Sequence, residues 1–229
     1  MAYLFAPFVT SLPIAGSALR FPLRRVWCIG RNYADHVKEM GQAALPQAPV
    51  IFGKPADAVV AEGGAIPFPC ATVDLHHEVE LVVAIGQDGF RIAPEAALQH
   101  VYGYAVGIDF TRRDLQQAAK ARGEPWETAK SFDRSAPVGV IQPASACGHP
   151  ASGAIHLSVN GKLRQQGDLA QMIWRVPALI AQVSRLFELH AGDLLFTGTP
   201  AGVGAVVAGD RLEAEIEGVG TLAVTLTAP

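Results

Sequence analysis

The sequence predicts a mainly β fold of the α+β class, with a few helices at its periphery. Seven short runs of apolar and β-branched residues recur along the chain, whereas only three segments carry the spacing or the end signals of a helix. The 23 glycines and 16 prolines are scattered through the chain, which indicates frequent turns between short elements. Many strands with few helices point to one mainly β domain with helical additions.

The predicted strands are short and are bounded by turn residues. Asn160 and Gly161 lie between two apolar runs and are typical of a two-residue hairpin turn, because both central positions of that turn need a positive φ. The predicted strands cover residues 49–52, 79–85, 102–108, 155–159, 194–197, 211–216 and 221–226.

Three helices are predicted. A short one covers residues 34–40. Thr111 and Asp114 have the spacing of a capping box, which would begin a second helix that runs to about Arg122 and stops at Gly123. Pro177 would begin the third helix. The apolar face of this third helix is predicted to comprise Leu179, Ile180, Val183, Leu186 and Phe187.

Length and composition indicate a single compact domain. The 229 residues suffice for a sizeable core, and the hydrophobic share of 50% with only 17% charged residues excludes a disordered chain. We expect one catalytic-type domain over residues 24–229. Residues 1–23 form an N-terminal extension that is too short to fold alone.

Charge and hydropathy exclude two classes of partner. The net charge of −3 and the pI of about 6.1 give no basic surface for nucleic acid, and no apolar run approaches the ~18 residues of a membrane span. The N-terminus lacks the pattern of a signal peptide. Cys28, Cys70 and Cys147 form no Cys-x-x-Cys pair, which is typical of free thiols in a reducing compartment. We therefore expect a cytoplasmic protein with no nucleic-acid or membrane partner.

Two carboxylates stand inside an otherwise apolar stretch. Glu78 and Glu80 share one face of the predicted strand, because side chains alternate, and Val79 takes the other. Buried carboxylates are costly unless they are paired or bound to a metal. Asp109 ends the next apolar run, and three oxygen ligands without a thiolate suit Mg²⁺, Mn²⁺ or Ca²⁺. From spacing alone, a solvated strand face with Asp109 in a turn explains these residues equally well.

The neighbouring histidines have different expected places. His76 lies on the same face as the two glutamates, as a fourth ligand or as a partner behind the ligands, whereas His77 points to the opposite face. Upstream, His36 and Glu39 are three residues apart and share a helix face, and a carboxylate beside a histidine suits activation of water. An exposed helix with a solvated His36 is the alternative that periodicity leaves open.

Other candidates carry weaker signals. Lys130 and Arg113 are candidate cations for a substrate, although single basic residues are more often at the surface. The loop over residues 197–204 is rich in glycine but lacks the Gly-Lys-Ser/Thr ending of a nucleotide-binding loop. Its glycines would still let backbone N–H groups approach a carboxylate, and Thr199 would donate a hydrogen bond there.

Taken together, these segments resemble the fumarylacetoacetate hydrolase family, and in particular its short acylpyruvate hydrolase branch. The resemblance runs from about Val26 to Leu226. It rests on several ordered motifs: Gly30-Arg-Asn-Tyr-Ala-Asp-His36, Lys54-Pro55, His76-His-Glu-Val-Glu80, Gly107-Ile-Asp109, Pro125-Trp126, Ala129-Lys-Ser-Phe132, Gly192-Asp193, Thr197-Gly-Thr-Pro200 and Gly202-Val-Gly204.

The resemblance implies a mixed β-sandwich roll with flanking helices, usually a homodimer. It implies that Glu78, Glu80 and Asp109 bind Mg²⁺ or Mn²⁺. By the same resemblance, His36 and Glu39 form the catalytic pair on a segment that closes as a lid. Lys130 joins the catalytic residues, and the residues that contact a small 2-oxo acid substrate are Arg113, Thr199 and Arg31.

The expected reaction is hydrolysis of the carbon–carbon bond in an acylpyruvate such as fumarylpyruvate or acetylpyruvate. His36, with Glu39 behind it, would deprotonate the water that attacks C4, and Lys130 with the cation would stabilise the departing pyruvate enolate. The same site would also suit an enzyme that decarboxylates oxaloacetate or interconverts its keto and enol forms, and this is the alternative activity. A third hypothesis is a non-catalytic domain with a structural cation, and such a domain would not require Lys130 or the His36–Glu39 pair.

Overall fold

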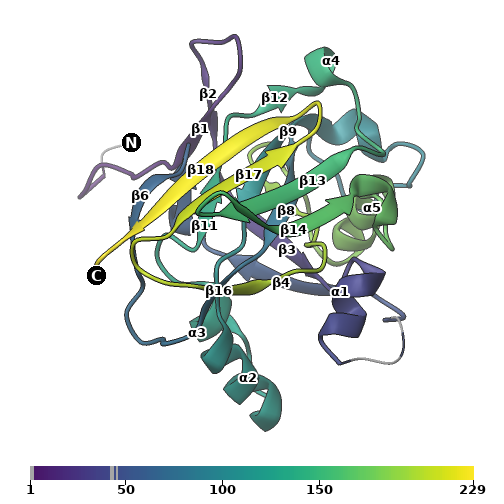
Figure 1. The fold of residues 1–229 in the computed structure, drawn as a ribbon. Coiled ribbons are helices and arrows are strands. Elements are labelled where there is room, and N and C mark those ends of the chain that lie inside the picture. The colour runs from purple at the N-terminus through teal and green to yellow at the C-terminus, as the bar shows by residue number, and fades with distance from the viewer. Residues whose placement is uncertain (1–2, 42–43, 45) are drawn as a thin grey trace.

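The computed structural model describes residues 3–41, 44 and 46–229, and strands dominate it (Figure 1). Residues 1–2 of the expected N-terminal extension lie outside this described part. Its α-helices are α1 (Ala34–Glu39), α2 (Arg113–Arg122), α3 (Glu127–Lys130), α4 (Ala144–Cys147) and α5 (Val176–Leu186). Its 3₁₀ turns are Ala56–Ala58, Ala97–His100 and Leu169–Gln171. No helix in the described part is both long and apolar enough to cross a membrane.

The larger sheet is mixed, with the order β4-β3-β15-β8-β9-β11-β5 and with β12 paired to β9. Its pairs are antiparallel apart from β15–β3 and β11–β5, which are parallel. Its strands are β3 (Val26–Gly30), β4 (Val50–Lys54), β5 (Val59–Ala61), β8 (Val79–Ile85), β9 (Val101–Ile108), β11 (Ala136–Val138), β12 (Gln142–Pro143) and β15 (Leu194–Phe196).

A second sheet has the order β14-β13-β17-β18-β6. Its strands are β6 (Gly64–Pro67), β13 (Ala154–Val159), β14 (Lys162–Asp168), β17 (Arg211–Ile216) and β18 (Gly220–Thr227). A small sheet joins β7 (Leu75–His77) to β10 (Thr111–Arg112) and β16 (Gly204–Val206). β1 (Ser11–Pro13) and β2 (Arg20–Pro22) form a separate hairpin.

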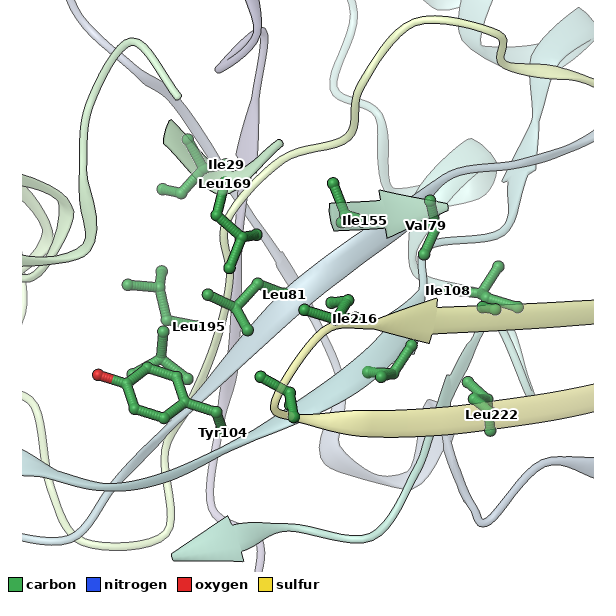
Figure 2. Close-up of a cluster of buried hydrophobic side chains, with 14 of the residues drawn as sticks. Ile29, Val79, Leu81, Tyr104, Ile108, Ile155, Leu169, Leu195, Ile216 and Leu222 are labelled. Carbon is green, nitrogen blue, oxygen red and sulfur yellow. The ribbon is translucent and has the colours of Figure 1, made fainter. Parts of the chain in front are cut away.

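The main core lies between the two large sheets. Alternate residues of β8, such as Leu81 and Val83, share one apolar cluster with Ile155, Ile216 and Leu222 from the second sheet (Figure 2). The side chains between them in β8, such as Val82 and Ala84, point the other way, since successive strand residues alternate. β8 is therefore buried on both faces, and a carboxylate in it is largely shielded from bulk water.

The β1–β2 hairpin covers part of the opposite face of the larger sheet. Leu12 and Phe21 of the hairpin join Val82, Leu194 and Phe196 in a second apolar cluster. In Figure 1 this hairpin lies at one end of the molecule, and α1, α2 and α3 lie at the other. That second end is where the predicted functional residues gather.

The predicted fold class is confirmed, and so are several turn signals. Asn160 and Gly161 have φ values of 52° and 75° in the turn between β13 and β14, as the hairpin prediction requires. Gly123 ends α2 in the left-handed conformation, with a φ of 67°. Pro177 lies in the first turn of α5, where its missing N–H costs nothing.

Two local predictions are wrong. The helix α2 begins after Arg112 without any side-chain cap, because Thr111 is already paired to His76 as part of β10, and so the capping box does not form. The third helix ends at Leu186, which is 65% exposed rather than on the buried face. Phe187 lies beyond the helix and stacks on Trp27 with a centroid distance of 4.1 Å.

Candidate active site

The three predicted carboxylates converge at the end of β8 and β9. These strands pair antiparallel with Val79 opposite Ile108, and the Asp109 N–H donates to the Glu78 carbonyl at 2.8 Å. The register places Glu78, Glu80 and Asp109 on the same face of the pair. All three are buried, and each offers one carboxylate oxygen within 4.8 Å of the other two.

Three buried cations surround these carboxylates. Lys130 at the end of α3 donates to Glu78 Oε2 at 2.8 Å and to Asp109 Oδ2 at 2.6 Å. Arg113 at the start of α2 pairs with the other oxygen of Glu78. Lys54 Nζ lies 2.9 Å from Asp109 Oδ1, but its approach is poorly directed, and this oxygen has no hydrogen bond in the described structure. Glu78 and Asp109 therefore each have two cationic partners among the described residues.

The carboxylates differ in their proton affinity. Burial raises the pKa of Glu78, but Lys130 and Arg113 outweigh burial and hold this pKa well below its ordinary value. Burial, with Asp109 and Glu78 close by, raises the pKa of Glu80 well above its ordinary value. Within the described part of the chain, the one hydrogen bond that Glu80 accepts comes from the Gly198 N–H, at 2.6 Å. Three buried carboxylates, of which one lacks a positive partner, fit a hard divalent cation.

The predicted pair on α1 is in contact. His36 Nδ1 lies 3.1 Å from Glu39 Oε2, and the Gly202 N–H donates to Glu39 Oε1 at 3.0 Å. His36 is 6% exposed, so its ring is largely screened from bulk water. A carboxylate on Nδ1 fixes the ring orientation and leaves Nε2 for the cavity that the ring lines.

A cavity of about 130 Å³ connects these groups. The predicted residues in its wall are Arg31, His36, Glu78, Glu80, Arg113, Lys130 and Thr199. Asp109 and Glu39 do not line it, but each contacts a residue that does. The structure therefore brings every predicted site residue to one place, whereas their chemical roles stay predictions.

His76 supports Arg113 and does not join the carboxylate cluster. Its Nδ1 accepts from Arg113 Nε at 3.3 Å, and its Nε2 donates to Asp74 Oδ1 at 2.9 Å. Both ring nitrogens are therefore engaged. The sequence left two roles open for His76, as a fourth ligand or as a partner behind the ligands, and the structure shows the second arrangement. Burial and the Arg113 charge lower the pKa of His76, which favours the neutral ring needed to accept from Arg113.

A buried glutamine on β14 holds Thr199. The Gln165 side-chain oxygen accepts from the Val79 N–H at 3.0 Å and from His77 Nδ1 at 2.8 Å. Its amide nitrogen therefore faces the other way and donates to Thr199 Oγ1 at 2.8 Å and to the Pro200 carbonyl at 3.0 Å. Because Thr199 Oγ1 already accepts one hydrogen bond, its own hydrogen is available for the cavity. His77 contacts Gln165, and no contact with the three carboxylates is found among the described residues.

The glycine-rich loop packs too closely against its neighbours for larger residues. A Cβ on Gly198 would lie 2.7 Å from the Asn32 Cβ, and one on Gly202 would lie 2.1 Å from the Arg164 carbonyl. Backbone N–H groups at both positions donate to carboxylates, whereas the expected contact with a substrate carboxylate stays a prediction. The carboxylates are Glu80 and Glu39 of the protein itself.

Sequence reasoning missed four polar residues of this region. Lys54 entered only as part of a family motif, and Gln165 carried no signal in its polar strand. Gln116 and Lys120 could have been found, because they follow Arg113 at helical spacing on one face of α2. Both line the cavity.

Comparisons with known proteins agree with this geometry. Residues 25–227 match the family model for the fumarylacetoacetate (FAA) hydrolase C-terminal domain. A crystal structure of fumarylpyruvate hydrolase from Pseudomonas aeruginosa, in complex with Mn²⁺ and pyruvate, is 50% identical, with a TM-score of 0.96 and full coverage of both chains.

Other similar proteins are named for a different activity, the tautomerisation of oxaloacetate. Mitochondrial oxaloacetate tautomerase FAHD1 from Rattus norvegicus is 45% identical over 205 residues, which are 86% of this chain and 92% of the relative. Oxaloacetate tautomerase YcgM from Escherichia coli K12 is 44% identical over 204 residues, which are 89% and 93% of the two chains. The chain belongs to the fumarylacetoacetate hydrolase family of enzymes.

Proposed function

We propose that this enzyme hydrolyses the carbon–carbon bond of acylpyruvates, which gives pyruvate and a carboxylic acid. The observation that carries the proposal is the His36–Glu39 pair, which faces a cavity with the buried carboxylate cluster in its wall. Hydrolysis needs a base that activates water, and His36, held by Glu39 beside the cavity, would serve as that base. The 50% identity to a fumarylpyruvate hydrolase over the whole chain supports the same reaction.

The carboxylates Glu78, Glu80 and Asp109 would hold Mg²⁺ or Mn²⁺. A divalent cation there would supply a Lewis acid for the C1 carboxylate and the C2 oxygen of the substrate. Thr199, whose hydroxyl hydrogen is free, would donate to the substrate carboxylate, and Arg31 and Arg113 would add positive charge around it.

The protein residues would carry the protons. His36 would take a proton from water through Nε2 while Glu39 stabilises the imidazolium, and the hydroxide would add to C4. The C3–C4 bond then breaks, its electron pair passes into the pyruvate enolate, and the His36 proton returns to C3. Lys130 lies at the carboxylate cluster and would stabilise the negative charge that develops on the enolate oxygen.

A second candidate is keto–enol tautomerisation of oxaloacetate, which the named activity of the similar tautomerases favours. It needs only removal of a C3 proton and its return to oxygen, and His36 with Lys130 would serve as the proton carriers. The two reactions differ in product, since tautomerisation releases no pyruvate.

The test is a product assay on purified enzyme with Mg²⁺ or Mn²⁺, and with a chelator as the metal-free control. We expect fumarylpyruvate or acetylpyruvate to lose absorbance and to yield pyruvate, and we expect His36→Asn to lower kcat by about 100-fold or more. Absence of pyruvate from both acylpyruvates, under conditions in which enolic oxaloacetate is converted, would assign the tautomerase instead.

A further inference from the structure

A second cavity lies apart from the carboxylate cluster. It has a volume of about 350 Å³ and shares no wall residue with the cavity that His36 lines. Its apolar wall comes from Leu98, Leu169, Met172 and Val176, and Leu169 is labelled in Figure 2. Cavities of about 300–1000 Å³ with apolar walls and a few polar groups are typical of small-molecule sites. The proposed reaction uses no residue of this wall.

Arg175 brings a positive charge to this cavity. It lines the cavity from an exposed position, and its guanidinium donates to the Ala151 carbonyl at 2.8 Å and to the Ala170 carbonyl at 3.3 Å. In the described part of the chain, the arginines that pair with a carboxylate are Arg24, Arg113, Arg122 and Arg211. Arg175 is not among them. Both of its acceptors are neutral, so its charge is not compensated, and the guanidinium keeps further N–H donors for an anion.

The start of α5 adds donors at the same place. Arg175 precedes the helix and gives no side-chain cap, and the first-turn residues Val176, Pro177 and Ala178 line the cavity. Among the described residues, no backbone carbonyl accepts from the Val176 or Ala178 N–H. The first turn of a helix carries partial positive charge, which favours a carboxylate. The uncompensated arginine and the helix start therefore lie beside one apolar wall.

A buried tyrosine and a histidine complete the polar part of the wall. Burial raises the pKa of Tyr104, so its hydroxyl keeps the proton and donates to His149 Nδ1 at 2.7 Å. With Nδ1 as the acceptor, the neutral ring carries its hydrogen on Nε2. His149 is thus a further donor, which suits an anionic ligand and not a cationic one.

The wall of this cavity also holds the segment that leads into α1. Met172 pairs with Tyr33 in an isolated β-bridge, and the Ile173 N–H donates to the Asn32 carbonyl at 2.8 Å. The Asn32 side chain accepts from the Trp174 N–H at 2.7 Å and donates to the Trp174 carbonyl at 3.0 Å. A ligand that packs on Met172 therefore restrains the residues just before the helix that carries the proposed base.

We propose that this cavity binds an amphipathic carboxylate, such as a medium-chain fatty acid, and that binding stabilises the segment that leads into α1. The hydrocarbon chain lies against the apolar wall, and the carboxylate lies at Arg175 and the start of α5. An uncharged apolar molecule would fill the same space but leave the charge of Arg175 uncompensated. The inference does not depend on which reaction the enzyme catalyses.

The experiment varies the chain and the head group of the ligand separately. Calorimetry measures the binding of butanoate, hexanoate, octanoate and 1-octanol to Mn²⁺-loaded enzyme, in excess pyruvate to occupy the catalytic cavity. We expect the acids to bind about threefold tighter for each added CH₂, because each buries apolar surface. Octanoate should bind about tenfold tighter than 1-octanol, because only the acid carries a negative charge.

Variants place the ligand. Arg175→Met should weaken octanoate about tenfold and leave 1-octanol unchanged, whereas Arg175→Lys should keep most of the affinity. Ala178→Phe fills the cavity and should abolish the binding of both. Arg185→Met is the matched control, because Arg185 lies in the last turn of α5 and lines a neighbouring groove instead of this cavity. Octanoate should also slow hydrogen exchange over residues 32–39 in the wild type and not in Ala178→Phe.

Three outcomes would overturn the proposal. Octanoate binding that pyruvate abolishes, or that Arg175→Met leaves unchanged, would place the ligand elsewhere. Unchanged exchange over residues 32–39 in the octanoate complex would remove the link to α1. If octanoate does not bind and Ala178→Phe changes the oligomeric state in size-exclusion chromatography, the cavity is a contact between copies of this chain.

Discussion

At the scale of single residues, Gln165 shows how a buried amide can set the direction of a hydroxyl group. The Val79 N–H can only donate, so it identifies the side-chain oxygen of Gln165, and the amide nitrogen must point to Thr199. Gln165 is fully buried, so no water competes for these bonds. Gln165 is thus a positioning residue for Thr199 and has no contact of its own with the cavity.

We predict that Gln165→Met raises KM for the substrate about tenfold, with a smaller change in kcat, because Thr199 loses the partner that orients its hydroxyl. In a Thr199→Val background the same substitution should add little, since no hydroxyl remains to be oriented. Steady-state kinetics on the four proteins of this cycle measure the coupling. Gln166→Met, an exposed neighbour on the same strand, is the control. Equal effects of Gln165→Met in both backgrounds would show that Gln165 acts on stability alone.

The residues that sequence could predict are those whose place follows from strand alternation or helical spacing. Glu78, Glu80 and Asp109 belong to this class because β8 and β9 pair regularly at the end where these residues lie, and the register shift between Ala84 and Ile85 is at the other end. Gln165 does not, since the β13–β14 register shifts at Ser158 and turns Gln165 inward while Leu163 is 50% exposed. A bulge of this kind leaves no pattern in the sequence.

At the scale of elements, the loop between β15 and β16 connects both halves of the site. Its Gly198 N–H binds Glu80 beside the carboxylate cluster, and its Gly202 N–H binds Glu39 on α1. Close packing on Asn32 and Arg164 fixes both ends of the loop. The position of α1, and with it of His36, therefore depends on a backbone contact.

We predict that Gly202→Ala lowers Tm by about 4–8 °C, because the new Cβ meets the Arg164 carbonyl and costs about 2 kcal/mol. It should also lower kcat, since the displaced loop no longer holds Glu39. Gly209→Ala is the matched control: Gly209 has a similar φ of 98° against 93° for Gly202, but no atom lies within 4 Å of its added Cβ. Thermal melts and kcat measurements on both variants provide the comparison. An equal loss of activity in the two variants would assign the effect to backbone strain instead of the Glu39 contact.

The bounds of a helix or strand could be predicted from the sequence where its own residues, rather than its pairing partners, determine them. The strands β8 and β17 have the bounds that the sequence predicts. The three-residue strand β7 and the two-residue strand β10 depend on their pairing partners, since β7 pairs with both β10 and β16, and the β7–β10 pairing removes Thr111 from the expected helix cap. Tertiary contacts decided these short elements, and no local signal could have done so.

At the scale of the whole molecule, the two packed sheets place the site in a dry interior. The core between the sheets and the cluster under the β1–β2 hairpin bury both faces of β8, so Glu80 is 2% exposed. The sheet order was not predictable from the sequence, because β15 inserts between β3 and β8 from more than a hundred residues away. The ordered family motifs, rather than local patterns, predicted this architecture.

This dry interior gives the enzyme a metal affinity that we predict to rise with pH. Because burial and its acidic neighbours raise the pKa of Glu80, the carboxyl group keeps a proton at pH values above its ordinary pKa of about 4.3. A divalent cation needs the ionised form, so Mn²⁺ binding should release this proton and weaken as pH falls. Calorimetric titrations with Mn²⁺ in buffers of different ionisation enthalpy measure the proton release.

In the same protein, Mn²⁺ at about 100 times its Kd should stabilise the fold by about 2.7 kcal/mol and raise Tm by about 5–10 °C. Glu80→Gln keeps the shape and the Gly198 contact but cannot lose a proton, so both the proton release and most of the Tm increase should disappear. Glu213→Gln on the exposed face of β17 removes the same charge far from the cavity and should retain both effects. Metal binding without proton release in the wild type would mean that Glu80 is already ionised. Lys130 and Lys54 would then compensate its charge more fully than their contacts with the other two carboxylates indicate.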